Sequence, residues 1–334
     1  MAADADDMPQ LKVRFRIHQQ GALRRKECEI MPRAKRFKGI VRTVTLIKED
    51  MARLITMPLE EMDAWSPVKV ELYDDWDSLL GAMARTMVDK IVENNRAGKV
   101  TTFILPVGPT GQYPVAAEIS NRERVSWKNV WTFNMDEYLD WQGRPVPEDH
   151  PMSFRSAMKR DLFDRLDADL RIPEEQHWFP DPFAPDAIDD KIAEVTGGEG
   201  VDVCYGGIGE HGHVAFNESP DLMAHYTHLT PEEFKASKTR PLPLNPETLV
   251  RALRSPLYTL CPPGAVTLGM KVILGARRIE LATDARLGRI AAMHPPSMDF
   301  PVTFIQEHAN AKDTVKLYVC RQGWGAPAPA KKAD

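Results

Sequence analysis

The sequence lacks the features that would place it in a membrane or secretory class. No stretch of its 334 residues approaches the roughly 18 consecutive apolar residues that a membrane-spanning helix needs. Its first ten residues, MAADADDMPQ, contain neither the basic nor the apolar segment of a secretory signal. We therefore expect a cytoplasmic protein with no membrane partner.

Cysteine is scarce as well, and the four cysteines are scattered. Cys28, Cys204, Cys261 and Cys320 form no CxxC pair, which excludes a zinc ribbon and a disulfide framework. No internal repeat occurs, nor a Walker A, GxGxxG or HExxH motif. The 43 % hydrophobic and 27 % charged residues are typical of a globular protein. The length allows two domains, or one large α/β domain with an appendage.

The net charge of −5 is unevenly distributed along the chain. Residues 12–42 contain 11 Lys and Arg against two acids, Glu27 and Glu29, a balance of +9 that leaves −14 for the remainder. Such a segment could bind nucleic acid or dock on the acidic body, but no basic-aromatic, finger or zipper pattern accompanies it, so we do not expect a nucleic-acid partner. Alternation in KVRFRIH and VRTVTLI favours a small β-hairpin within a basic extension over residues 1–67.

Beyond residue 67, short apolar segments alternate with stretches of helical periodicity, which predicts a parallel α/β sheet flanked by helices. Asp74 or Asp75 should cap the first of these helices and Gly98 should end it, and a further helix is expected from about Pro151 through Leu166. In such sheets ligands bind at the carboxyl ends of the strands. The predicted strands are VKVELY, TFILPV, VWTFN, VDVCYG, RIELAT and VKLYVC.

A turn of small residues follows the second predicted strand, in ILPVGPTGQYP. The turn consists of Gly108, Pro109, Thr110 and Gly111 and leads into a helix. Its backbone N–H groups, the positive end of the helix and the Thr110 hydroxyl would suit an anion. The alternative is an ordinary turn whose glycines provide tight geometry.

Two adjacent carboxylates, Asp136 and Glu137, follow the third predicted strand in WTFNMDEYLD. The interior of the strand should be dry, so one of them could face a crevice with a pKa suited to taking a proton from carbon. The alternative is that they cap the N-terminus of a helix.

A glycine-rich loop follows the fourth predicted strand, in VDVCYGGIGEHGHVAFNES. Its glycines would let a ligand approach the backbone. Two histidines beside glutamates could bind a metal, but further ligands are missing, so we expect none. We favour an acid/base relay in which a neighbouring Glu raises the pKa of the histidine. The polar residues of the loop are Glu210, His211, His213, Asn217 and Glu218.

Taken in order, FILPVGPTGQYP, FNMDEYLD, HPMSF and GGIGEHGHVAFNES resemble the motifs of the glucosamine-6-phosphate deaminase/isomerase family, with 6-phosphogluconolactonases as more distant relatives. The resemblance spans roughly Val68 to Cys320 and includes PPGAVTLGM and FIQEH, where Gln306 and His308 match a recurring pair. The ending Phe216-Asn217-Glu218 favours the deaminase branch. The resemblance implies a Rossmann-like sheet over a domain of residues 68–321 and a cofactor-free reaction. The low-complexity end GAPAPAKKAD predicts a flexible tail over 322–334.

The resemblance also implies roles for individual residues. Asp136 matches the general base that moves a proton between C2 and C1 of a hexose 6-phosphate. His213 matches the group that opens the sugar ring, supported by Glu218. His211 completes the expected catalytic set. The expected substrate and phosphate contacts are Gly108, Pro109, Thr110, Gly111, Glu137, Gly209, Gly212, Arg240 and Arg286.

Two positions depart from the family pattern. His211 stands where the family usually has Asp or Asn, and a protonated imidazole there lowers the pKa of His213. Pro109 removes one backbone donor from the phosphate turn. We expect an isomerase/deaminase that converts glucosamine 6-phosphate to fructose 6-phosphate and ammonia, as a homo-oligomer. The alternatives are a non-catalytic sugar-phosphate sensor and a 6-phosphogluconolactonase-type hydrolase.

Overall fold

The computed structural model describes residues 14–15, 26–27, 53–220, 229–253 and 261–323. A seven-stranded sheet in the order β3-β12-β11-β8-β4-β5-β7 forms its centre, and all neighbouring strands are parallel. This sheet confirms the predicted α/β fold and contains all six predicted strands, whereas the two-residue edge strand β7 was not predicted. The strands are β3 (Lys69–Tyr73), β4 (Thr101–Leu105), β5 (Val130–Asn134), β7 (His177–Trp178), β8 (Val203–Gly207), β11 (Ile279–Asp284) and β12 (Val315–Cys320).

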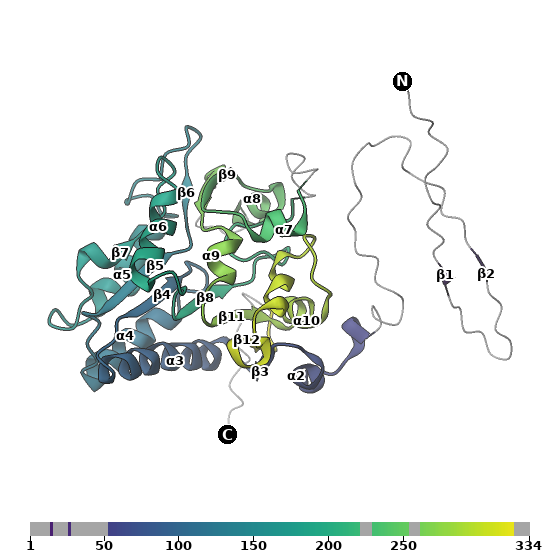
Figure 1. The fold of residues 1–334 in the computed structure, drawn as a ribbon, viewed down its shortest axis with the longest axis horizontal. Helices are drawn as coiled ribbons and strands as arrows, with labels where there is room; N and C mark the ends of the chain where they lie inside the picture. The colour runs from purple at the N-terminus through teal and green to yellow at the C-terminus, as the bar shows by residue number, and fades with distance from the viewer. Residues whose placement is uncertain (1–13, 16–25, 28–52, 221–228, 254–260, 324–334) are drawn as a thin grey trace, which may run out of the picture.

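Helices cover both faces of this sheet (Figure 1). On one face pack α3 (Trp76–Arg96), α4 (Gln112–Glu123) and α5 (Phe154–Asp161). On the other pack α6 (Asp186–Thr196), α9 (Met270–Leu274) and α10 (Ala285–Met293). Phe103 and Leu105 of β4 belong to the first core and Ile104 to the second, which explains why this strand is apolar at successive positions.

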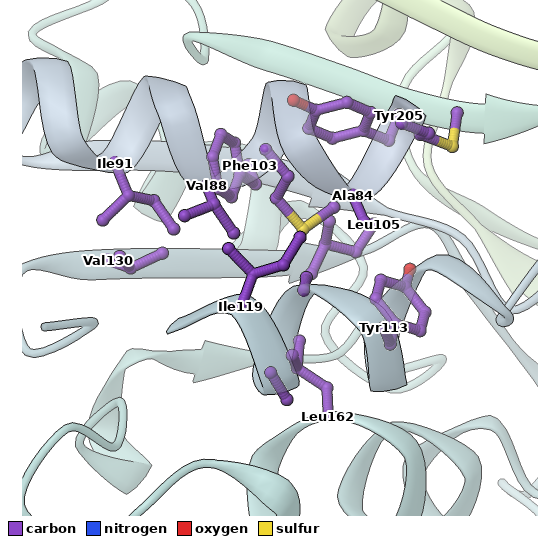
Figure 2. Close-up of a cluster of buried hydrophobic side chains, with 14 of the residues drawn as sticks. Ala84, Val88, Ile91, Phe103, Leu105, Tyr113, Ile119, Val130, Leu162 and Tyr205 are labelled. Carbon is purple, nitrogen blue, oxygen red and sulfur yellow. The ribbon is translucent and has the colours of Figure 1, made fainter. Parts of the chain in front are cut away.

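The core between α3 and the sheet follows the predicted periodicity (Figure 2). Ala84, Val88 and Ile91 lie on the buried side of α3, at the spacing of three and four residues that keeps side chains on one helix face. Asp75 caps this helix by accepting a hydrogen bond from the N–H of Ser78 at 2.8 Å, as predicted. The helix therefore begins and ends where its sequence indicates.

A second, antiparallel sheet in the order β6-β10-β9 was not predicted. It consists of β6 (Asp136–Leu139), β9 (Arg240–Pro243) and β10 (Gly264–Thr267). Only Met135 separates β5 from β6, so the chain passes from one sheet to the other immediately before Asp136. The helix expected from Pro151 to Leu166 is shorter than predicted, because α5 ends at Asp161 and Leu162 leaves the helical conformation.

The remaining elements are short. They are η2 (Leu59–Glu61), α2 (Met62–Trp65), η3 (Phe163–Arg165), η4 (Glu174–Gln176), α7 (Pro231–Lys235), α8 (Pro246–Leu253), η5 (Pro301–Glu307) and α11 (Ala311–Thr314). No helix among the described residues is long and apolar enough to cross a membrane.

Within the N-terminal extension the structure describes one antiparallel pair, β1 (Arg14–Phe15) with β2 (Lys26–Glu27). The first strand lies in the predicted KVRFRIH segment, whereas VRTVTLI lies outside the described residues. The tail beyond residue 323 also lies outside them. The boundaries 1–67, 68–321 and 322–334 therefore stay predictions.

Candidate active site

A cavity of about 250 Å³ opens at the carboxyl ends of the parallel strands, where the sequence predicts the site. Its walls come from the segments that follow four neighbouring strands of the sheet, β5, β4, β8 and β11. Five predicted site residues line it, and they are Gly108, Pro109, Asp136, Gly209 and His213. The other predicted residues do not line it, and they are Thr110, Gly111, Glu137, His211, Gly212, Glu218, Arg240 and Arg286.

Asp136 is the buried carboxylate of the cavity. It is the first residue of β6, and the residue is 6 % exposed. Within the described part of the chain no group donates a hydrogen bond to its carboxylate. Burial, and then the charge of neighbouring Glu137, raise the pKa of Asp136 well above its usual value. A carboxylate held in this way is a stronger base than an exposed one.

Glu137 faces the N-terminus of α5 instead of the cavity. Its Oε1 accepts hydrogen bonds from the N–H groups of Tyr138 and Phe154, and its Oε2 accepts one from the N–H of Arg155, at 2.9 to 3.0 Å. Burial raises the pKa of Glu137, while these hydrogen bonds lower it. Of the two adjacent carboxylates, one therefore faces the cavity and the other binds a helix N-terminus.

His213 enters the cavity from the glycine-rich loop after β8. Its Nδ1 lies 3.8 Å from Oε1 of Glu218, and the ring is buried. Burial, and then the charge of His211, lower the pKa of His213 to about 4. The expectation that a neighbouring Glu raises this pKa is wrong, because removal of the ring from water outweighs a carboxylate that lies beyond hydrogen-bond distance. As predicted, the charge of His211 lowers the pKa of His213.

The two loops of the site approach each other backbone to backbone. A Cβ atom on Gly207 would lie 2.3 Å from the carbonyl oxygen of Gly108, so only glycine fits there. Gly108 and Pro109 thereby reach the cavity wall, whereas Thr110 and Gly111 continue into the start of α4, which has no side-chain cap. The turn at Gly108 and Pro109 and the glycine-rich loop after β8 therefore form one continuous wall.

Glu218 lies behind His213, against α8. Its Oε2 accepts a hydrogen bond of 2.7 Å from the N–H of Asn245, and its Oε1 accepts one from the hydroxyl of Thr248. Burial raises the pKa of Glu218, while the hydrogen bonds from Thr248 and Asn245 lower it. The carboxylate is therefore fixed by two donors from one short segment of the chain.

The two predicted phosphate-binding arginines lie in different places. Arg286 forms an ion pair of 2.9 Å with Glu210, which lines the cavity. Arg240 donates a hydrogen bond to Oδ1 of Asn217 at 3.1 Å and lines a second, largely apolar cavity of about 320 Å³. Among the described residues, no Lys or Arg lines the first cavity itself. Arg286 therefore places a cation at its edge.

The sequence did not predict several polar residues of the cavity wall, among them Asp284 and Thr248. Asp284 directly follows the predicted strand RIELAT and caps α10 by accepting from the N–H of Leu287 at 2.9 Å. Its position at a strand end was the signal that could have found it. Thr248 is on α8 and carries no such signal, because it reaches the cavity only through the fold.

The matched pair Gln306 and His308 lies outside the cavity wall. Gln306 donates hydrogen bonds to the carbonyl oxygens of Ala291 and His294, each at 2.8 Å. Nε2 of His308 lies 2.8 Å from the carbonyl oxygen of Ala276. Both side chains therefore connect backbone segments. Among the described residues, no group of three or more His, Cys, Asp or Glu is arranged to hold a metal ion.

Comparison with known proteins identifies relatives over most of the chain, although no family model matches it. A Caenorhabditis elegans protein named glucosamine-6-phosphate deaminase is 31 % identical over 221 residues, which cover 64 % of this chain and 75 % of that protein. The solved structure of a monomeric glucosamine-6-phosphate deaminase is 25 % identical, with a TM-score of 0.60, over 76 % of this chain and 98 % of that one. The fold is also that of a 6-phosphogluconolactonase from Plasmodium vivax, which is 14 % identical over 78 % of this chain and 95 % of that one, with a TM-score of 0.54.

Proposed function

The chain belongs to the glucosamine-6-phosphate deaminase family, and on this basis we propose that it converts glucosamine 6-phosphate and water into fructose 6-phosphate and ammonia. The observation that carries the proposal is the presence of Asp136 and His213 in the walls of one cavity. The reaction needs a carboxylate that moves a carbon-bound proton and a second group that moves protons on oxygen. These two side chains are the minimum set, and no cofactor takes part.

His213 opens the sugar ring in this proposal. Because burial lowers its pKa to about 4, the imidazole is neutral at neutral pH. A neutral ring can take the proton of the O1 hydroxyl and deliver a proton to the ring oxygen, which breaks the C1–O5 bond. Glu218, 3.8 Å from Nδ1, stabilises the positive charge that the ring carries between these two transfers.

Asp136 then acts on the open-chain sugar. It removes the proton from C2 while O1 gains a proton, which gives an enolamine, and it then returns a proton to C1 while the nitrogen loses one. The aldehyde with a C2 amine thereby becomes an imine at C2 with a hydroxyl at C1. Water adds to this imine, and ammonia leaves as the ketone of fructose 6-phosphate forms. The buried position of Asp136 supports this role, since a raised pKa makes the carboxylate a better acceptor for a carbon-bound proton.

The phosphate group positions the substrate. We assign it to the wall formed by Gly108 and Pro109, near the N-terminus of α4, with Arg286 as the charged partner from the cavity edge. Binding of the phosphate group, away from the reacting carbons, holds the C2 proton against Asp136.

Incubation of the purified full-length chain with glucosamine 6-phosphate tests the proposal. Ammonia and fructose 6-phosphate should appear in equal amounts, and Asp136→Asn should abolish both. Hydrolysis of 6-phosphogluconolactone that survives Asp136→Asn would indicate the lactonase alternative. Thermal stabilisation by sugar phosphates without turnover would indicate a sensor. Either result in place of ammonia release would contradict the deaminase proposal.

We also propose that the chain forms a homo-oligomer and acts in the cytoplasm. Trp65, Trp141 and Phe183 are exposed aromatic side chains of the kind that association would bury. The described cysteines, Cys204, Cys261 and Cys320, are free, which suits a reducing compartment. The solved deaminase described above is monomeric, so the mass in solution, measured by light scattering, decides between the two states. A monomer mass at micromolar concentration would contradict the oligomer.

A further inference from the structure

One carboxylate oxygen of the active site, Oε1 of Glu218, lies next to two polar groups. The hydroxyl of Thr248 donates a hydrogen bond to it, whereas Nδ1 of His213 lies 3.8 Å away. Nδ1 is buried and has no hydrogen-bond partner among the described residues. Thr248 itself lines the cavity, on the first turn of α8. The hydroxyl of Thr248 therefore binds the same carboxylate oxygen that lies 3.8 Å from the His213 ring.

We propose that Thr248 is a positioning residue of the active site, whose hydroxyl fixes Glu218 as a carboxylate at a set distance behind His213. The predicted effect of Thr248 on turnover rests on the proposed function. Its predicted effect on the titration of Glu218 does not, because that titration is measured without substrate.

The physical basis is the burial of Glu218. Its side chain is 4 % exposed, and a carboxylate removed from water to this extent stays ionised only where hydrogen bonds replace the lost water. Thr248 and the N–H of Asn245 are the two donors to it from the described chain. Loss of the hydroxyl leaves Oε1 without its donor, so protonation of the carboxyl becomes easier.

Other charged groups face Glu218 from three directions, and a substitution at position 248 leaves all of them in place. The glycine-rich loop contributes His211 and His213, α8 contributes Glu247, and the second cavity, which Glu218 also lines, contributes Arg240, Lys238 and Glu233. A change in the titration of Glu218 after substitution of Thr248 therefore reports the lost hydrogen bond and not a changed charge.

The test is a carboxyl titration by ¹³C NMR on the full chain without substrate, with Glu218→Gln used to assign the signal. In Thr248→Val, which keeps the shape and removes the donor, the acid dissociation constant of Glu218 should fall by roughly tenfold to a hundredfold, the size expected for a hydrogen bond to a charged group. Thr248→Ser keeps the hydroxyl and should titrate like the wild type. The acid limb of the pH–rate profile should move to higher pH in Thr248→Val and should stay at its wild-type position in Thr248→Ser.

Two results would overturn the inference: equal titration of Glu218 in Thr248→Val and wild type, or an equal shift in Thr248→Ser and Thr248→Val. If Thr248→Val fails to fold, Thr248→Ala provides the same comparison with a smaller side chain. A shift of Glu218 in a chain that does not release ammonia from glucosamine 6-phosphate would leave the positioning role standing and would contradict the proposed function alone.

Discussion

The imidazole ring of His213 occupies the space that a side chain on Gly209 would need. A Cβ atom on Gly209 would lie 1.8 Å from Nε2 of His213, far inside van der Waals contact. The N–H of Gly209 also donates to the carbonyl oxygen of His213 at 2.9 Å, so the loop closes on itself at this point. The ring keeps its place in the cavity wall because residue 209 has no side chain.

Gly209→Ala should therefore displace His213 and lower kcat by roughly a hundredfold or more, which is the contribution expected of a positioned acid/base group. The matched control is Gly81→Ala, since a Cβ on Gly81 meets no atom within 4 Å and the residue lies inside α3. Steady-state kinetics of both variants with glucosamine 6-phosphate give the comparison. Wild-type kcat in Gly209→Ala would contradict the role of the ring.

Asp136 should make folding stability depend on pH. Its pKa in the folded protein is raised by burial and by Glu137, so the folded state binds more protons than the unfolded state above the ordinary carboxyl range. The free energy of unfolding should then fall as pH rises through that range toward the raised pKa. Asp136→Asn should lose less stability over the same interval. Denaturant unfolding at several pH values measures this, and parallel curves for the two proteins would contradict it.

His211→Asp should raise the pKa of His213. The present charge of His211 lowers that pKa, and an anion in its place favours the protonated ring. We expect the acid limb of the pH–rate profile to move to higher pH. Because an uncharged side chain removes only the repulsion, His211→Asn should move it less. An unchanged acid limb in His211→Asp would show that residue 211 does not act on His213.

Glu210→Gln should strengthen substrate binding. Glu210 holds Arg286 in an ion pair at the cavity edge, and a phosphate group must compete with that carboxylate. Since exposed ion pairs contribute about 0.2–1 kcal/mol, release of Arg286 should lower KM by up to roughly fivefold. The control is Glu199→Gln, which breaks the ion pair between Glu199 and Arg277. This pair lies outside the cavity wall, so KM should stay unchanged. A raised KM in Glu210→Gln would contradict the competition.

The parallel sheet was predictable because its strands are buried on both faces, so that β4 is apolar at Phe103, Ile104 and Leu105 in succession. The antiparallel sheet was not, since β9 contains Pro241 and Pro243, which disfavour a strand except at an edge. The position of β9 at the edge becomes known only from the fold.

In the candidate site, too, some residues could be predicted from the sequence and others could not. Asp136 and His213 directly follow predicted strands or lie in the loop after one, and so their place at the sheet's carboxyl edge could be predicted. The separate role of Glu137 depends on Phe154, 17 residues along the chain, and that of Thr248 on Glu218, 30 residues away. Such pairings come from the packing of α5 and α8, which the local pattern does not contain.

The most direct test of the catalytic assignment uses glucosamine 6-phosphate with deuterium at C2. In the wild-type enzyme, cleavage of the C2–deuterium bond should keep pace with ammonia release, and the deuterium should be found at C1 of fructose 6-phosphate or in the solvent. Asp136→Asn should leave the bond intact while the protein remains folded. Cleavage by Asp136→Asn at the wild-type rate, or no cleavage by the wild type, would contradict the assignment.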